Sequence, residues 1–304
     1  MLKIFLRIGI GLVLLCLLLQ VVKFEEVFRV IQNASLGYII IAFLFVVFNQ
    51  GAQILKWHYL LKVTNTGLSF ADALKSYLFG VTLGTITPGQ LGELGGRALH
   101  IENNNRAFLI GLTIFDRAQM FVIMAFCGIP AVVYLLSFNL LYTFAAFFIE
   151  FICLLLVYFN TESLKIKLNG IKWKLLKKKF VQDLLGSFTF LNRTQFLISS
   201  MFSILDFFIV YFQTTILLLA FVDVNFSDAL WGYSAVMFTK ALLPISFGDL
   251  GVREAASILF YGKINVPIAA AFNTALLMFF INIFLPSLVG VLFIPSFNKR
   301  NILK

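Results

Sequence analysis

The chain has 304 residues, of which 61% are hydrophobic and only 12% are charged. A soluble domain carries about 25% charged residues, so this composition excludes a soluble globular protein and leaves no long polar segment for a separate catalytic domain. The formal net charge of +10 does not indicate nucleic-acid binding, because most of the excess lies at the chain ends and in one lysine-rich loop. We expect an all-α polytopic membrane protein.

Six stretches of the chain are apolar and long enough to cross a bilayer, which takes about 20 residues. They lie at 4–22, 36–60, 107–136, 138–160, 196–221 and 267–296. Residues 1–22 carry Lys3 and Arg7 and are followed by no small-residue cleavage site, so we expect an uncleaved span and not a signal peptide.

Polar residues elsewhere in these spans give weaker signals. Lys56 and Trp57 lie near the end of the second span, where aromatic anchoring and snorkelling of a long side chain explain them. Glu150 and Asp206 are isolated acids in later spans. Either acid is a conceivable proton-relay residue, but we predict a site at neither.

Two further apolar segments, 70–100 and 226–260, repeat one another at a constant offset of 156 residues. Ten of 28 aligned positions are identical without a gap, and Glu93 is matched by Asp249, which keeps the charge. The identical residues are Phe70, Asp72, Ala73, Leu74, Tyr77, Pro88, Gly92, Leu94, Gly95 and Arg97, which recur as Phe226, Asp228, Ala229, Leu230, Tyr233, Pro244, Gly248, Leu250, Gly251 and Arg253. Paired hydrophobic segments that Gly and Pro interrupt are the best sequence pointer to a transporter site.

Basic residues indicate the orientation of the chain. Segment 161–183 holds seven lysines, and the positive-inside rule places it in the cytoplasm together with both basic termini. This orientation needs an even number of spans on each side of the loop, which holds if both repeat segments return to the side they enter from. Because three spans separate them, the two segments would enter from opposite sides, as an inverted repeat of two re-entrant broken helices.

This topology defines the expected domain organisation. We expect a single integral membrane domain over residues 1–304, with about six spanning helices and two re-entrant segments. Repeat 1 covers about 36–136 and repeat 2 covers about 196–296, on either side of the basic loop. The protein would lie in the cell membrane, which is the inner membrane in a double-membraned bacterium.

Each copy of the repeat contains residues that break a helix. The first copy is interrupted at Pro88–Gly89, and a new helix is expected to begin near Gly92. The second copy is interrupted at Pro244, where Gly248 or Gly251 lets the backbone turn. A helix that begins at such a break has unpaired amides and the positive end of its dipole, which together form a ready anion site.

Charged pairs follow both breaks. Glu93 precedes Arg97 by four residues, as Asp249 precedes Arg253, so each pair would share one helical face. An arginine fork suits phosphate. A pair that only pins two helices is the open alternative, but recurrence at both breaks favours a substrate pathway. The predicted substrate-binding residues are Pro88, Gly89, Gly92, Glu93, Arg97, Asp116, Arg117, Lys240, Pro244, Ser246, Gly248, Asp249, Gly251, Arg253 and Glu254.

The stretches TPGQLGELGGRAL, followed by Asp116–Arg117, and PISFGDLGVREA resemble signatures of the flippase-like membrane domain of lysylphosphatidylglycerol synthases. The resemblance covers nearly the whole chain and implies a helical bundle with re-entrant elements that moves a lipid between leaflets. The chain departs from the family pattern at Gln90, where the family often has Gly, and at Asp116, where it usually has Glu. We find no domain for lysine transfer in the sequence and expect no synthase activity.

We therefore predict a flippase-like protein that moves an anionic phospholipid or a lipid-linked saccharide between leaflets, and no enzyme. The headgroup phosphate would lie near Arg97 and Arg253, with Glu93, Asp249 and Glu254 as the gate. No GxxxxGKS/T pattern for ATP occurs, and neither histidines nor cysteines have metal-site spacing. We expect membrane lipids as partners, no nucleic acid, no metal and no cofactor.

Two alternatives remain. One is an intramembrane enzyme acting on a phospholipid or polyprenyl phosphate, since paired carboxylates can serve as general acid and base, with Ser246 as the one candidate nucleophile beside a motif. The other is a non-catalytic partner of a separate membrane glycosyltransferase or synthase. Such a partner would tolerate the loss of both arginines.

Overall fold

The computed structural model describes residues 24–64, 67–87, 89–101, 105–137, 139–159, 182–184, 186–187, 190–243 and 249–293. Within these ranges the chain is all-helical and has no strand. The expected first span at 4–22 and nearly all of the basic loop lie outside the described residues.

Four of the expected spans are confirmed as long apolar helices. They are α3 (Leu36–Val63), α6 (Arg106–Ser137), α10 (Arg193–Leu219) and the continuous segment Ile268–Val291. That last segment comprises α13 (Ile268–Phe279), the π-helix η2 (Phe280–Phe284) and α14 (Leu285–Val291). These helices show that the chain is an integral membrane protein.

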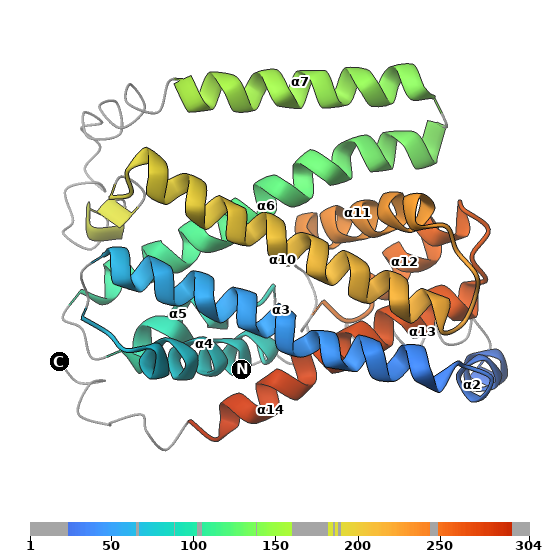
Figure 1. Ribbon diagram of the computed structural model, residues 1–304, viewed down its shortest axis with the longest axis horizontal. Helices are drawn as coiled ribbons and strands as arrows, with labels where there is room; N and C mark the ends of the chain where they lie inside the picture. The colour runs from blue at the N-terminus through green and yellow to red at the C-terminus, as the bar shows by residue number, and fades with distance from the viewer. Residues whose placement is uncertain are drawn as a thin grey trace, which may run out of the picture.

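Helices α3 and α10 form a packed pair. In Figure 1, α3 and α10 lie side by side across the middle of the molecule, and they pack closely on each other. Helix α7 (Leu140–Phe159) corresponds to the stretch predicted at 138–160 and lies along one edge, packed on α6. Its large apolar side chains, such as Leu141 and Phe144, are exposed, as lipid-facing residues would be. The short helix α2 (Phe24–Gln32) lies at the end of α3 and packs on α13.

Both repeat segments fold into a pair of helices with a break between them. The first forms α4 (Phe70–Thr85) and α5 (Gly92–His100), and the second forms α11 (Phe226–Leu242) and α12 (Val252–Gly262). The two helices of each pair pack on each other. The pairs occupy opposite ends of the bundle in Figure 1.

Helix α4 begins at a capping box, in which Ser69 and Asp72 bond to each other's backbone. The Asp72 carboxylate accepts hydrogen bonds from the Ser69 hydroxyl and the Ser69 N–H. These bonds favour the charged form and lower the pKa of Asp72 from its usual value. The cap fixes where the first broken segment starts.

The two breaks differ in detail. In the first, Gly89 and Gln90 have φ of 57° and α5 begins at Gly92, as predicted. In the second, Asp249 and Gly251 have φ of 62° and 85°, and α12 begins only at Val252. The prediction that Asp249 and Arg253 share a helical face is therefore wrong, because Asp249 lies in the turn before the helix. Gly251 is confirmed as a turning residue, since φ in this region favours glycine.

We expect Gly290→Ala to lower the melting temperature of the purified protein. A Cβ atom at Gly290 would lie 2.1 Å from Thr82 Oγ1 and 2.2 Å from the Leu78 carbonyl oxygen, where α14 packs on α4. Overpacking of this kind costs typically about 1–3 kcal/mol. Gly95→Ala is the matched control, because a Cβ there would meet nothing within 4 Å. Equal melting temperatures for the two variants would contradict the close packing.

Candidate functional site

A cavity of about 150 Å³ lies between the two broken segments. Residues of both repeat motifs line it, although they are more than 130 positions apart in the sequence. The basic lining residues are Lys56, Arg117, Lys240 and Arg253, and the acidic ones are Glu93, Asp116 and Asp206. Most of the predicted charged residues thus line one cavity inside the apolar bundle.

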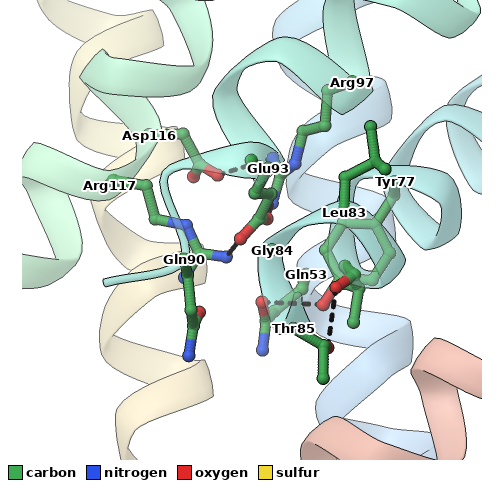
Figure 2. A network of polar contacts seen from close by, with 12 residues as sticks. Gln53, Tyr77, Leu83, Gly84, Thr85, Gln90, Glu93, Arg97, Asp116 and Arg117 are labelled. Carbon is green, nitrogen blue, oxygen red and sulfur yellow. Dashed lines mark hydrogen bonds and ion pairs between the residues drawn. The ribbon is translucent and has the colours of Figure 1, made fainter. Parts of the chain in front are cut away.

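The first motif forms a buried ion-pair cluster, shown in Figure 2. The Glu93 carboxylate on α5 accepts hydrogen bonds from Arg97 and from Arg117 of α6. Arg97 also donates from Nη1 to Asp116 Oδ2 at 2.8 Å. Its guanidinium carbon lies 4.8 Å from the ring centroids of both Trp57 and Tyr77. With 1% of its surface exposed, Arg97 joins α3, α4, α5 and α6.

Arg117 differs from Arg97 in its access to solvent. Its side chain is 39% exposed, compared with 1% for the side chain of Arg97. Arg117 lines the cavity, whereas the guanidinium of Arg97 is enclosed by two rings and two carboxylates. Of the two arginines, Arg117 is therefore the one that a ligand in the cavity can reach.

Lys56 lies at the centre of the site, and the snorkelling interpretation of this residue is wrong. Its Nζ lies 2.5 Å from Asp116 Oδ1 and donates to Ser203 Oγ at 2.5 Å, which links α3, α6 and α10. Trp57 is also buried and donates from Nε1 to Ser76 Oγ at 2.7 Å. The sequence signal that would have located Lys56 is its spacing from Asn49 and Gln53, since the three polar residues recur on one face of α3.

The second motif is arranged around Asp249. Its Oδ2 atom lies 3.2 Å from Lys240 Nζ and 3.7 Å from Arg253 Nη2. Gln90 Nε2 donates to the same oxygen at 3.1 Å, across 159 residues of sequence. One carboxylate therefore joins the break of the first repeat to the break of the second. Gln90, one of the two positions at which the sequence was expected to depart from the family it resembles, makes this contact.

The amides at the two helix starts are already used within the chain. Gly92 N–H donates to Thr87 Oγ1 at 2.6 Å, and Glu93 N–H donates to the Gln90 carbonyl oxygen at 3.0 Å. Gly251 N–H donates to Glu254 Oε2 at 2.6 Å, so this acid completes the start of α12. The expectation of unpaired amides does not hold for these three groups, and an anion in the cavity would meet side chains instead.

The remaining predicted residues are placed as follows. Gly89 is part of the first break, and Gly251 is the N-cap residue of α12. Asp116 and Arg117 on α6 and Lys240 on α11 join the two clusters described above. Pro88, Pro244, Ser246 and Gly248 lie outside the described residues.

A network of carboxamides next to the cavity was not predicted. Asn49 Nδ2 donates to Asp206 Oδ1 at 2.9 Å, and Gln50 Nε2 donates to Asn49 Oδ1 at 3.0 Å. Asn282, in the π-helix η2, exchanges hydrogen bonds with Gln213 at 2.7 Å and 3.1 Å. π-Helical turns inside α-helices are frequent at functional sites.

The chemistry of this site is ionic and hydrogen-bonding. Four cations from four helices face one small space, which suits an anionic group of a ligand. In the part of the chain that the structure describes, no group of three or more His, Cys, Asp or Glu residues has the arrangement of a metal site.

Comparison with protein families assigns the chain. The family described as Lysylphosphatidylglycerol synthase TM region matches residues 4–290. Because the match covers nearly the whole chain, the protein belongs to this family, which confirms the resemblance seen in the sequence. The match is to the membrane region and gives no evidence of a catalytic domain. No curated protein and no solved structure matches the chain.

Proposed function

We propose that this member of the family moves an anionic lipid between the leaflets of the membrane, with the headgroup phosphate in the cavity between the two breaks. The observation that carries the proposal is the convergence of cations from both repeat motifs on one cavity inside a membrane protein. Ionisable residues within a membrane are costly and usually mark a substrate or ion path.

In this proposal the cations have different roles. Arg117, Lys240 and Arg253 line the cavity and would bind the phosphate directly. Arg97 would instead hold Glu93 and Asp116 in place, because its guanidinium is enclosed. The acyl or prenyl tails would stay in the lipid between helices.

An inverted repeat would fit this role. The broken segments α4–α5 and α11–α12 occupy opposite ends of the bundle, and their breaks meet at Gln90 and Asp249. Broken helices that enter from opposite sides would give the headgroup a path from each leaflet to one central site. We keep both termini and the basic loop in the cytoplasm as part of the proposal.

Asp249 would act as the gate. Its carboxylate now collects Lys240, Arg253 and Gln90, which are donors that a phosphate in the cavity would use. An arriving phosphate would replace Asp249 as their partner and so separate the two breaks. Of the three acids that the sequence analysis expected to form the gate, Glu93, Asp249 and Glu254, we give this role to Asp249 alone.

The test is lipid translocation by the purified protein in vesicles. The vesicles contain phosphatidylcholine and phosphatidylglycerol with a trace of tail-labelled fluorescent phosphatidylglycerol, and dithionite quenching reports the label in the outer leaflet. We expect labelled phosphatidylglycerol to exchange between leaflets faster than in protein-free vesicles. In the vesicles with protein, labelled phosphatidylcholine should exchange more slowly than labelled phosphatidylglycerol. Equal rates with and without the protein for both labels would overturn the proposal.

We expect Asp249→Asn to bind anionic lipid more tightly than the wild type. The substitution removes the negative charge that competes with phosphate, and the Asn side chain leaves Lys240 and Arg253 more available. A charged hydrogen bond contributes about 1.5–3 kcal/mol, so the affinity should rise by roughly tenfold or more. Quantitative native mass spectrometry with added phosphatidylglycerol measures this change. Glu150→Gln is the control, since this acid does not line the cavity. Unchanged or weaker binding by the Asp249 variant would rule out the gate.

A further inference from the structure

Asp206 is a buried acid in the cavity that the proposed function does not use. It lies on the spanning helix α10, lines the cavity and is 7% exposed. Its hydrogen-bond partner is a carboxamide, since Asn49 Nδ2 donates to Asp206 Oδ1 at 2.9 Å. Among the described residues, no salt bridge to Asp206 is present within 4.0 Å.

The other acids around the cavity are occupied. Glu93, Asp116 and Asp249 each contact two basic side chains. A proton on any of these three would break ion pairs that join helices. Glu254 Oε2 accepts a hydrogen bond from the Gly251 N–H, and Glu254 does not line the cavity. Asp206 is therefore the lining carboxylate that can gain or lose a proton with least damage to the cluster.

Charged and titratable groups from α3, α4, α6 and α11 interact with Asp206, and Tyr77 is the one from α4. Lys56 comes from α3 and is bonded to Ser203, one turn before Asp206 on α10. Asp116 and Arg117 come from α6, and Tyr233 comes from α11. Lys56 forms its direct ion pair with Asp116. Its positive charge therefore compensates the charge of Asp116 more than that of Asp206.

Moving an anionic headgroup across the membrane also moves its charge. One elementary charge crossing a potential of 100 mV changes the free energy by about 2.3 kcal/mol. A proton that travels with the headgroup cancels this charge. Intramembrane carboxylates are the usual carriers of such protons.

We propose that Asp206 takes up one proton together with the anionic headgroup, so that lipid and proton cross as a neutral pair. The proton passes from water on the side where the headgroup enters to the Asp206 carboxylate, and it is released to water on the other side. Headgroup and proton then strengthen each other's binding, because linkage between two sites is reciprocal. This inference rests on the proposed function and names its coupling ion.

The test measures the leaflet distribution of labelled phosphatidylglycerol in the same vesicles, under an imposed pH gradient or an imposed potassium-diffusion potential. With one proton per lipid, one pH unit across the membrane shifts the wild-type distribution about tenfold. The membrane potential should leave the wild-type distribution unchanged. A wild type that responds to potential but not to pH overturns the inference and leaves the proposed function standing. A wild type that moves no lipid overturns both.

Asp206→Asn assigns the proton to this residue. The variant keeps a hydrogen-bonding side chain but cannot carry a proton, so its pH response should vanish. A potential of about 59 mV should instead shift its distribution about tenfold, because the lipid now carries one uncompensated charge. Asp206→Glu should keep the wild-type response, which guards against a variant that merely misfolds. Glu150→Gln, another intramembrane acid, should behave as the wild type. A full pH response in Asp206→Asn overturns the assignment.

Discussion

Replacing Arg97 by alanine is expected to destabilise the protein by roughly 3–5 kcal/mol, the usual cost of breaking a buried ion pair by removing one partner. The substitution leaves Asp116 with Lys56 alone and leaves Glu93 with Arg117 alone. It also removes the cation that lies against the Trp57 and Tyr77 rings, where cation–π contact contributes up to about 2 kcal/mol when desolvated. Helix α5 would lose one of its two ion-paired attachments to α6.

The melting temperature of the purified protein in detergent measures this effect. Arg117→Ala is the matched control, because Arg117 pairs with the same carboxylate but has a partly exposed side chain. Compared with Arg97→Ala, the Arg117→Ala variant should therefore have a higher melting temperature and a lower affinity for phosphatidylglycerol. If Arg97→Ala keeps the wild-type melting temperature but no longer binds phosphatidylglycerol, Arg97 contacts the headgroup and its role as an internal attachment is wrong.

The broken helices could be predicted from the sequence because their determinants are local. Proline and glycine act on their own stretch of backbone, and their recurrence at a constant offset marks both breaks. The start of α5 at Gly92 follows from this rule. The start of α12 does not, because the turn continues through Gly251 at φ 85° and depends on how Asp249 is held by Lys240 and Gln90.

The centre of the site could not be predicted by the same means. Hydropathy places Lys56 near the end of a span, but its depth in the bundle depends on how α3, α6 and α10 cross. Asp206 appears isolated in the sequence because its partner Asn49 is 157 residues away. The contact between Gln90 and Asp249 likewise joins two breaks that are far apart in the sequence, and local sequence patterns do not predict that they meet. Such contacts are set by tertiary packing.

Arg253→Ala is expected to abolish or strongly reduce lipid translocation while the protein stays folded. Arg253 lines the cavity at the second break, where it would bind the phosphate. Loss of a charged hydrogen bond of about 1.5–3 kcal/mol lowers headgroup affinity by roughly 10- to 150-fold. Stability should fall less than in Arg97→Ala, because Arg253 lies 3.7 Å from Asp249, which keeps Lys240 and Gln90 as partners, whereas Arg97 forms hydrogen bonds with two carboxylates.

Translocation and melting temperature must be measured together on Arg253→Ala, Arg253→Lys and Lys263→Ala. Arg253→Lys keeps the charge but loses the planar fork, so it should retain part of the activity. Lys263 is an exposed cation just after the same helix, and its removal should have no effect. Full translocation by Arg253→Ala would contradict the proposed contact between Arg253 and phosphate. Arg97 and Arg253 would then both serve to attach helices to one another. Measuring transport and folding separately distinguishes a binding residue from a structural one at the second break. The comparison of the Arg97 and Arg117 variants makes the same distinction at the first break.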